Sequence, residues 1–332
     1  MTSNADWRPA ATQEILRARA RLLAAIRRFF EARGVLEVET PVVSATGATA
    51  PHLDSLLTQY QGPSAPHGQT FFLQTSPEFA MKRLLAAGSG PIYQICKAFR
   101  NGEAGRQHNP EFTMLEWYRP DFDLHALMDE VESLTTDLLA DVIKHPGERM
   151  TYAEAFQRYA DVDTHAASAP TLKACALRNG INDVAGLAED DRDGWLDLLL
   201  SHIVEPRLGH NHLCFIYNYP ASQAALSRLR HEPLSGRMLA ERFELYVNGM
   251  ELASGYHELG DSGMQRERFE HDRVQRRAHH KADVALDERL LAALEVGLPD
   301  CSGVALGVDR LLMLQVGVNS INDVLAFPID RA

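Results

Sequence analysis

The first part of the chain has apolar residues at helical spacing. Within residues 11–33 they recur at intervals of three or four, namely at Ile15, Ala18, Leu22, Ile26 and Phe29. Gly34 stands where such a helix would stop. The pattern therefore predicts a long amphipathic helix at the start of the chain.

Short apolar runs predict strands, and they come in blocks. Strands are expected near Leu56 and over residues 35–38, 71–74, 92–99, 112–118, 213–217, 242–255 and 303–306. Further helices are expected over residues 79–87, 264–280, 287–295 and from 308 onward, with Ser76 as the cap of the first of these. Strands that do not alternate regularly with helices indicate an α+β fold with an antiparallel β-sheet flanked by helices.

Chain length sets the expected domain organisation. With 332 residues and 45% hydrophobic composition, the chain is near the size at which a single core stops growing. The stretch 124–204 is mostly helical in pattern, and its Asp- and Ala-rich middle resembles an insertion. We expect one domain over residues 1–332, with a helical insertion at about 150–210.

Charge and cysteine usage narrow the class of protein. The formal net charge is −12 and is spread along the chain, so no basic footprint for nucleic acid is visible. The longest apolar runs are too short to span a bilayer and no signal peptide pattern begins the chain, which predicts a soluble, cytoplasmic protein. The four cysteines lack metal or redox spacing and are expected to be reduced.

A hairpin is predicted at Asn248-Gly249, which stands between two apolar runs. A type I′ turn needs positive φ at both central residues, and this dipeptide tolerates that best. A two-residue turn fixes the register, pairing Val247 with Met250, Tyr246 with Glu251 and Leu245 with Leu252.

In that register Glu244 and Glu251 are diagonal neighbours on one face, roughly 7 to 8 Å apart at Cα. Two carboxylates so placed could hold a hard cation such as Mg²⁺ together with substrate phosphates. A solvated outer face of the sheet explains two acids equally well, and the hairpin alone does not decide between these readings.

A second group of polar and aromatic residues follows Phe99. Arg100 and His108 lie in a loop where a guanidinium could meet phosphate oxygens. On the strand that follows, period two places Phe112, Met114, Glu116 and Tyr118 on one face and Thr113, Leu115 and Trp117 on the other.

The third group is residues 303–310, a strand of small and apolar residues that runs into a helix. Glycines let a ligand approach the backbone, and a helix start favours anions. Tight packing of strand on helix explains the same residues.

Taken in order, three segments resemble the signature motifs of class II aminoacyl-tRNA synthetases, in particular the lysine branch. They are Arg28-Phe29-Phe30 through Pro41, Arg100 through Tyr118 with His108-Asn109-Pro110-Glu111-Phe112-Thr113, and Gly303 through Arg310. The resemblance spans nearly the whole chain. It implies the class II catalytic fold and a homodimer, and the early start of the first motif implies that no anticodon-binding domain is present.

The resemblance implies site residues position by position. The catalytic residues would be Arg100 and Arg310. ATP would be bound by Arg100, Asn101, Gly102, His108, Asn109, Phe112, Glu244, Leu245, Gly307 and Arg310. The amino acid would be bound by Ser76, Pro77, Glu78, Glu116, Tyr118, Glu251, Ser254, Glu258 and Ala305. Glu244 and Glu251 would hold Mg²⁺, in agreement with the hairpin argument.

Three positions depart from the family pattern. Gly102 stands where an acid usually follows the motif arginine, Ser254 stands in place of Asn, and Ala305 stands in place of Gly. The methyl group of Ala305 would alter the amino-acid pocket and fits a substrate other than α-lysine.

The implied activity is ATP-dependent activation of (R)-β-lysine as an aminoacyl-adenylate, with transfer to the ε-amine of a lysine on elongation factor P. A minimal lysyl-tRNA synthetase is the nearest alternative. A catalytically inactive regulatory paralogue is the other, although it predicts decay at Arg100, Glu244, Glu251 and Arg310, which are all present.

Overall fold

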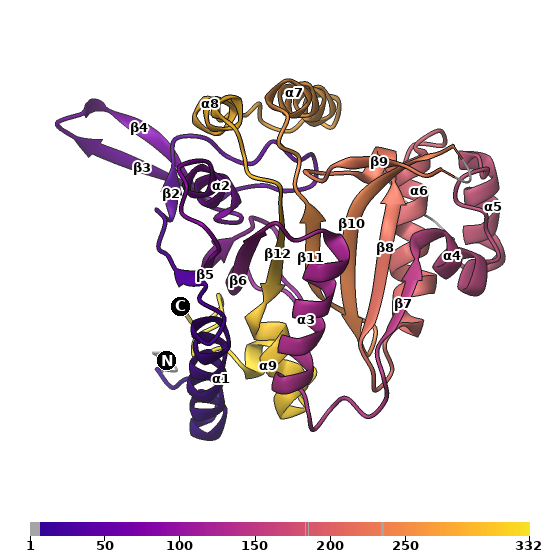
Figure 1. The fold of residues 1–332 in the computed structure, drawn as a ribbon, viewed down its shortest axis with the longest axis horizontal. Coiled ribbons are helices and arrows are strands. Elements are labelled where there is room, and N and C mark those ends of the chain that lie inside the picture. Colours follow the sequence, from indigo (N-terminus) through magenta and orange to yellow (C-terminus); the bar gives the residue numbers. More distant parts are fainter. Residues whose placement is uncertain (1–6, 183, 185, 234–235) are drawn as a thin grey trace, which may run out of the picture. The chain divides into compact units, whose positions relative to one another are not determined.

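The computed structural model describes residues 7–182, 184, 186–233 and 236–332. The chain forms two compact units, Met1–Asp121 with Gly260–Ala332, and Phe122–Leu259. We call them the first and the second unit. Both contain helices and mostly antiparallel strands, which confirms the α+β fold class (Figure 1). The prediction of a single domain stays a prediction.

The first unit contains the amino-terminal helix and the carboxyl-terminal part of the chain from Gly260 onward. Its elements are α1 (Gln13–Glu31), β1 (Leu36–Glu37), β2 (Val43–Ser44), β3 (Leu57–Gly62), β4 (Ala65–Leu73), α2 (Glu78–Ala86), β5 (Ile92–Phe99), β6 (Glu111–Pro120), α7 (Ser262–Ala278), α8 (Glu288–Val296), β12 (Cys301–Gly307), α9 (Val308–Val316) and the short helix η4 (Ile321–Asp323). Its main strands lie in the order β1-β5-β6-β12, and β2-β4-β3 form a small separate sheet. β1 is parallel to β5, whereas β5, β6 and β12 are antiparallel to their neighbours.

Helices cover both faces of β6. Tyr118 packs with Met81 and Leu85 of α2, so α2 covers the face that Glu116 shares. On the other face, the ring of Trp117 lies 5.3 Å from that of Phe30 in α1. The alternation predicted for this strand is therefore confirmed, and it separates the face of Glu116 under α2 from the face of Leu115 and Trp117.

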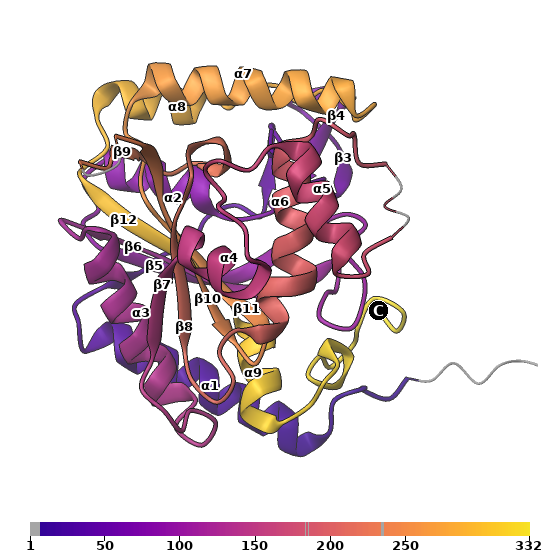
Figure 2. The same cartoon turned by 90° about the vertical axis from the view of Figure 1, so that its right-hand side faces the viewer.

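The second unit contains the predicted helical insertion. Its elements are α3 (Leu124–Leu138), β7 (Glu148–Thr151), α4 (Tyr152–Ala160), α5 (Ala169–Arg178), α6 (Arg192–Leu199), the short helices η1 (Leu200–Val204), η2 (Glu205–Arg207) and η3 (Ala221–Gln223), and strands β8 (Cys214–Pro220), β9 (Leu229–His231), β10 (Met238–Val247) and β11 (Met250–His257). The strand order is β11-β10-β8-β7, with β9 beside β10. Helix α3 lies on one face of these strands and α4, α5 and α6 on the other (Figure 2).

The insertion helices share a core with the strands beneath them. Their buried residues form one cluster with Cys214, Ile216 and Tyr219 of β8 and with Ala240 and Tyr246 of β10. Glu244 lies on this same face, because it is two residues from Tyr246 and pairs with Ile216. The insertion therefore covers the face of the strands that carries a predicted metal carboxylate.

Four local predictions need correction. The strands predicted near Leu56 and over 71–74 form one longer hairpin, β3–β4, and β7 interrupts the stretch predicted to be helical. The N-cap residue of α2 is Pro77 and not Ser76, although the Ser76 hydroxyl does accept a hydrogen bond from the amide of Glu78 in the first turn. The predicted Leu245–Leu252 pair is wrong, because Leu245 pairs with Ala253 across a bulge.

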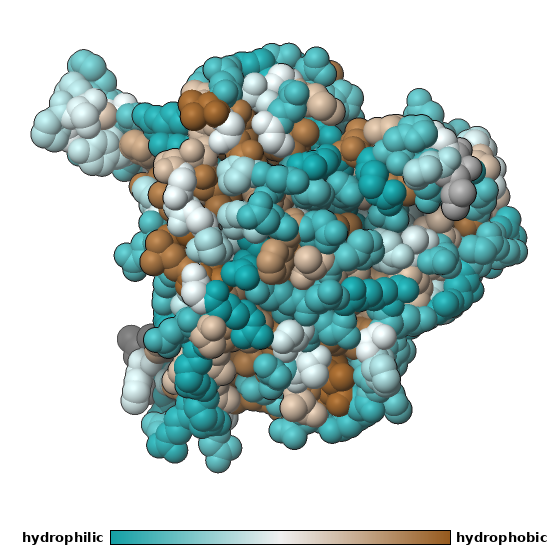
Figure 3. All heavy atoms as spheres, viewed as in Figure 1, coloured by the Kyte–Doolittle hydropathy of each residue, from teal (hydrophilic) through white to brown (hydrophobic). Residues whose placement is uncertain are grey.

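The surface of the protein is mostly polar. On the face shown in Figure 3, hydrophilic residues predominate and hydrophobic ones are interspersed among them. Among the described residues, no helix has the length and apolarity needed to cross a bilayer.

Candidate functional site

A buried carboxylate stands at the centre of the polar face of β6. Glu116 is 2% exposed. Its Oε2 accepts a hydrogen bond from the Ser76 hydroxyl at 2.7 Å and its Oε1 accepts one from the Tyr118 hydroxyl at 2.7 Å. Ala305 of β12 and Gln94 of β5 flank Glu116 on the neighbouring strands. Three residues predicted to bind the amino acid, Ser76, Tyr118 and Ala305, thus lie around one carboxylate, and Gln94 joins them.

Glu78 supplies a second carboxylate from the first turn of α2. Its Oε1 lies 2.6 Å from Nζ of Lys82, one turn further along the helix, and Lys82 is 1% exposed. The Ser76 hydroxyl accepts a hydrogen bond from the Glu78 amide at 3.0 Å while it donates to Glu116. Ser76 therefore ties the start of α2 to the strand. Lys82 was not among the predicted site residues, although its i,i+4 spacing from Glu78 was visible in the sequence.

The electrostatics of this cluster favour a protonated Glu116 in the free protein. Burial and then the negative charge of Glu78 raise the pKa of Glu116 to about 7. The hydroxyls of Tyr118 and Ser76 and the ammonium of Lys82 act in the opposite direction. Such a carboxyl can lose its proton near neutral pH and then receive an ammonium group.

The predicted phosphate-binding loop begins at Arg100. Its guanidinium lies 5.2 Å from the centre of the Phe112 ring and 3.8 Å from the carboxylate of Glu103. Nε of Arg100 is buried and has no hydrogen-bond partner among the described residues. Gly102 has a φ of +82°, a left-handed conformation that an acidic residue at this position would adopt only with strain. This backbone conformation gives a physical reason for the departure from the family pattern.

Arg310 meets the far end of the same loop. Its Nη2 donates to Nε2 of His108 at 2.7 Å, and its Nε donates to the carbonyl of Gln107 at 3.4 Å. Burial, and next the charge of Arg310, lower the pKa of His108, so the imidazole is neutral and accepts this hydrogen bond. Gly307 is the N-cap residue of α9, and it places Arg310 in the first turn of that helix.

Asn109 has a different environment from the one predicted. Its Nδ2 donates to the carbonyl of Glu111 at 2.6 Å, and its Oδ1 accepts from the amide of Ile329 at 3.1 Å. Both ends of the buried amide are thus used within the protein. Its role in ATP binding stays a prediction, and the structure adds a role in shaping the loop.

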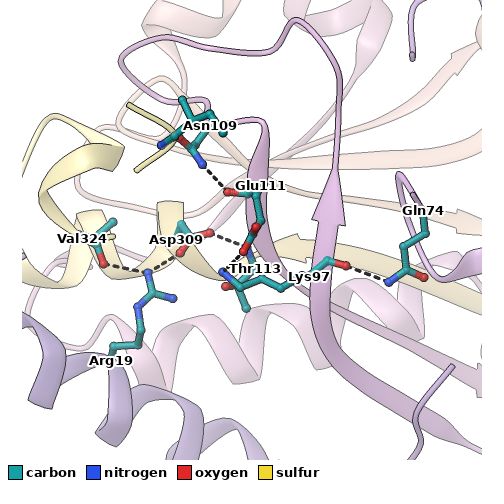
Figure 4. A network of polar contacts seen from close by, with 9 residues as sticks. Arg19, Gln74, Lys97, Asn109, Glu111, Thr113, Asp309 and Val324 are labelled. Atoms are coloured by element: carbon teal, nitrogen blue, oxygen red, sulfur yellow. Dashed lines mark hydrogen bonds and ion pairs between the residues drawn. The ribbon is translucent and has the colours of Figure 1, made fainter. Parts of the chain in front are cut away.

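Asp309 connects the second and third motif segments with α1, the helix that leads into the first, and sequence reasoning did not identify it as a site residue. One oxygen of this 1% exposed carboxylate accepts from the Thr113 amide of β6 at 2.6 Å, and the other meets the guanidinium of Arg19 in α1. Arg19 also donates to the carbonyl of Val324 at 3.0 Å. Figure 4 shows this network. It fixes the start of α9, where the neighbouring residue is Arg310.

In the second unit, Glu244 is held by three donors. Its Oε2 accepts from the Tyr219 hydroxyl at 2.6 Å and from the Tyr246 hydroxyl, and its Oε1 meets the guanidinium of Arg242. It is 6% exposed, which excludes the solvated outer face as an explanation for this residue. Burial alone would raise the pKa of Glu244, but Arg242 and the two hydroxyls together lower it. Glu244 is therefore ionised.

The β10–β11 hairpin confirms the predicted turn and changes the predicted register. Asn248 and Gly249 have φ of +50° and +71°, as a type I′ turn requires. Tyr246 pairs with Glu251, which places Glu251 on the face of Glu244. The bulge then places Ser254 directly opposite Glu244.

The remaining predicted residues of the second unit are Leu245 on β10, Ser254 on β11 and Glu258 just beyond β11. The Ser254 hydroxyl is buried and has no hydrogen-bond partner among the described residues, so it is available to a ligand. Glu258 is buried and pairs with Ser227 in an isolated bridge. The side chain of Leu245 is wholly buried, which leaves only its backbone for a nucleotide.

The described residues contain no group of three or more histidine, cysteine, aspartate or glutamate side chains that could hold a metal ion. The two glutamates on one face, Glu244 and Glu251, are oxygen donors of the kind that Mg²⁺ takes when phosphates and water complete its shell. They therefore fit a metal that arrives with a nucleotide rather than one held by the protein alone.

Comparisons with known proteins cover the whole chain. The family model of tRNA synthetases class II (D, K and N) matches residues 2–331. The chain is 49% identical to the elongation factor P–(R)-beta-lysine ligase of Salmonella paratyphi B and 51% identical to the protein of that name from Proteus mirabilis. A relative of the same name from Klebsiella pneumoniae is 49% identical. Each alignment covers 100% of this chain and 100% of the relative.

Proposed function

Because the chain belongs to the family of class II tRNA synthetases (D, K and N), we propose that it is an ATP-dependent ligase that activates (R)-β-lysine and transfers it to a lysine of elongation factor P. The names of its full-length relatives support this choice of substrates. The acceptor would be the ε-amine of that lysine.

One observation in the structure carries the proposal, namely the buried Glu116 carboxylate between two hydroxyls. A substrate with two ammonium groups needs a carboxylate for each, because an unpaired buried charge is costly. Glu116, Tyr118 and Glu258 would hold the distal ammonium, and Glu78 would take the amine near the carboxylate of the substrate.

The other predicted amino-acid contacts would shape the pocket. Ser76 and Pro77 would form its wall, and Ser254, with its buried hydroxyl, would meet the carboxylate of the substrate. Ala305 stands beside Glu116 in the neighbouring strand, where its methyl group would narrow the space near the distal ammonium.

The resemblance also supports the nucleotide contacts that we propose. Arg100 would bind the α-phosphate, Phe112 would stack on adenine, and Arg310 would bind the γ-phosphate or the other adenine face. Magnesium would be held by Glu244 and Glu251 together with ATP phosphates, and would offset charge on the phosphate oxygens.

The chemistry requires no nucleophilic side chain. A carboxylate oxygen of the substrate forms a bond to the α-phosphorus while the bond to the β-phosphate oxygen breaks, and pyrophosphate leaves. The neutral acceptor amine then attacks the carbonyl carbon, AMP leaves, and the amine loses a proton. Arg100 and Arg310 would position the phosphates and balance the charge that develops on them.

The test is ATP–pyrophosphate exchange with α-lysine and with (R)-β-lysine, followed by label transfer to elongation factor P and to lysine tRNA. Preference for β-lysine with transfer to the protein supports the proposal. Preference for α-lysine with transfer to tRNA identifies a minimal lysyl-tRNA synthetase instead. No exchange with either amino acid identifies an inactive paralogue. A homodimer, which the resemblance also implies, can be checked by light scattering.

A further inference from the structure

A loop without helix or strand, residues 45–56, is attached to α7 and α8 by side chains. Thr46 donates to Asp287 at 3.0 Å and Thr49 donates to Asp272 at 3.1 Å. Both acids belong to the first unit, as does the loop. The loop therefore depends on the two helices for its conformation, and Figure 2 shows these helices side by side.

The strongest attachment is Arg276, in the last turn of α7. Its guanidinium is part of a residue that is only 3% exposed. It donates to the carbonyl of Ala50 at 3.1 Å, to the carbonyl of Leu53 at 2.8 Å and to the carboxylate of Asp54 at 2.9 Å. A fourth hydrogen bond, from Nε to the carbonyl of Ala282 at 3.0 Å, holds the guanidinium itself.

Asp54 connects Arg276 with the predicted ATP-binding loop. Its carboxylate also meets Nζ of Lys281 at 2.9 Å. Its own carbonyl accepts a hydrogen bond from the amide of Asn101 at 2.7 Å. Asn101 stands between Arg100 and Gly102, which has a positive φ, so this bond holds the backbone close to the point at which the loop leaves β5.

We propose that Arg276 is a positioning residue for nucleotide binding, acting through Asp54 on the backbone at Asn101. The guanidinium touches no residue assigned to ATP. It holds two carbonyls and one carboxylate of a loop that is 222 residues or more away in sequence, and that loop sets the origin of the Arg100 segment. The role in nucleotide binding rests on the proposed ATP site, whereas the effect on the backbone at Asn101 can be measured by hydrogen exchange without ATP.

The chain offers a matched control on the same helix. Arg273, three residues earlier, makes a bidentate pair with Asp283, with Nε at 2.8 Å and Nη2 at 2.5 Å from its oxygens. That pair is partly exposed and joins α7 to the segment just after it. Arg273→Met therefore removes the two charge-assisted bonds of a neighbouring arginine on α7 without touching the loop.

The experiment compares Arg276→Met, Arg273→Met and the wild-type chain by hydrogen–deuterium exchange and by the KM for ATP in pyrophosphate exchange. We expect faster amide exchange over residues 98–103 in Arg276→Met only, since a local opening is reported by loss of protection. We expect its KM for ATP to rise about tenfold, less than the ~100-fold that a displacement of about 1 Å can cost in catalysis. Because Arg276 acts on the ATP-binding loop and not on the amino-acid pocket, the KM for the amino acid should change by less than about twofold.

Three outcomes overturn the inference. The first is an equal rate of amide hydrogen exchange over residues 98–103 in the two variants. The second is an unchanged KM for ATP in Arg276→Met, and the third is an equal increase of its KM for ATP and its KM for the amino acid. If Arg276→Met does not fold, Asp54→Asn keeps the backbone carbonyl and weakens only the charge pair, and it must still raise exchange over residues 98–103. If the wild-type chain shows no pyrophosphate exchange, the proposed function fails. The hydrogen–deuterium exchange of residues 98–103 still decides the inference about Arg276.

Discussion

Two buried glutamates, one in each unit, each accept hydrogen bonds from two hydroxyl groups, yet their pKa values are shifted in opposite directions. Glu116 accepts from Ser76 and Tyr118, and Glu244 accepts from Tyr219 and Tyr246. Burial raises the pKa of Glu116 to about 7, with Glu78 adding to the effect, whereas the pKa of Glu244 is lowered despite its burial.

The neighbouring charge decides the difference. Arg242 lies against Glu244, while the nearest charge that acts strongly on Glu116 is another carboxylate. Two hydroxyl donors are therefore not enough to keep a buried carboxylate ionised, whereas hydroxyl donors together with an adjacent cation are enough. In our proposal, Glu244 is prepared for a metal ion, and Glu116 waits for a cation that the substrate brings.

The largest effect should follow from removing the cation of Glu244. Arg242→Met leaves a buried carboxylate without its ion-pair partner, which typically costs about 3–5 kcal/mol of unfolding free energy. Urea denaturation at pH 8 would measure it. The double variant Arg242→Met/Glu244→Gln should recover much of the loss, because no unpaired charge remains.

Arg158→Met is the matched control in the same unit. Arg158 pairs with Glu148 at 2.6 Å, but both side chains are well exposed, and such pairs contribute about 0–1 kcal/mol. Equal losses in the Arg158 and Arg242 variants would refute the idea that a buried carboxylate of the second unit depends on its cation.

A smaller effect, on binding rather than folding, is expected from Glu116→Gln. The amide keeps the shape and removes the charge, so kcat/KM for the amino acid should fall by about 30-fold or more, which corresponds to about 2 kcal/mol. The KM for ATP should barely change. Steady-state pyrophosphate exchange with varied amino acid and then varied ATP would separate the two.

The control for this variant lies on the same strand. Glu111→Gln removes an exposed carboxylate that is 3.3 Å from Lys97. It should leave both KM values within about twofold, as expected for an exposed pair. A similar fall in kcat/KM in both variants would show that the loss does not come from the ammonium subsite.

Much of this contrast was predictable from local sequence, and part of it was not. Period two placed Glu116 with Tyr118 on one face of β6, and the Asn248-Gly249 turn placed Glu251 opposite Tyr246. The bulge between Leu245 and Tyr246 was not predictable, because register along a strand beyond a turn depends on packing against other strands.

The contacts that connect distant segments could not be predicted either. Asp309 bonds to Thr113 and Arg19, and Arg276 bonds to the loop near Asp54, across separations of about 200 residues or more. Nothing in the spacing of a single segment specifies such partners. They are determined only when the fold brings the segments together, and here they shape the predicted site from outside it.

The last prediction is a pH dependence, and it tests the protonation of Glu116. The folded chain keeps a proton on Glu116 up to a pKa of about 7, whereas the unfolded chain releases it near the ordinary value of 4.5. Between these two pH values the folded state binds more protons, so the contribution of Glu116 to stability falls as the pH rises and is fully lost above about 7.

Asp197 titrates in the same range, because burial raises its pKa to about 6, so a single pH profile cannot isolate Glu116. The difference between wild type and Glu116→Gln can, since groups such as Asp197 that do not act on Glu116 cancel. We expect the wild-type chain to lose free energy of unfolding relative to the variant from about pH 4.5 to about pH 7, and its KM for the amino acid to fall over the upper part of that range as the carboxylate ionises. Parallel profiles for the two chains would mean that Glu116 is already ionised in the free protein, and that the contrast with Glu244 does not exist.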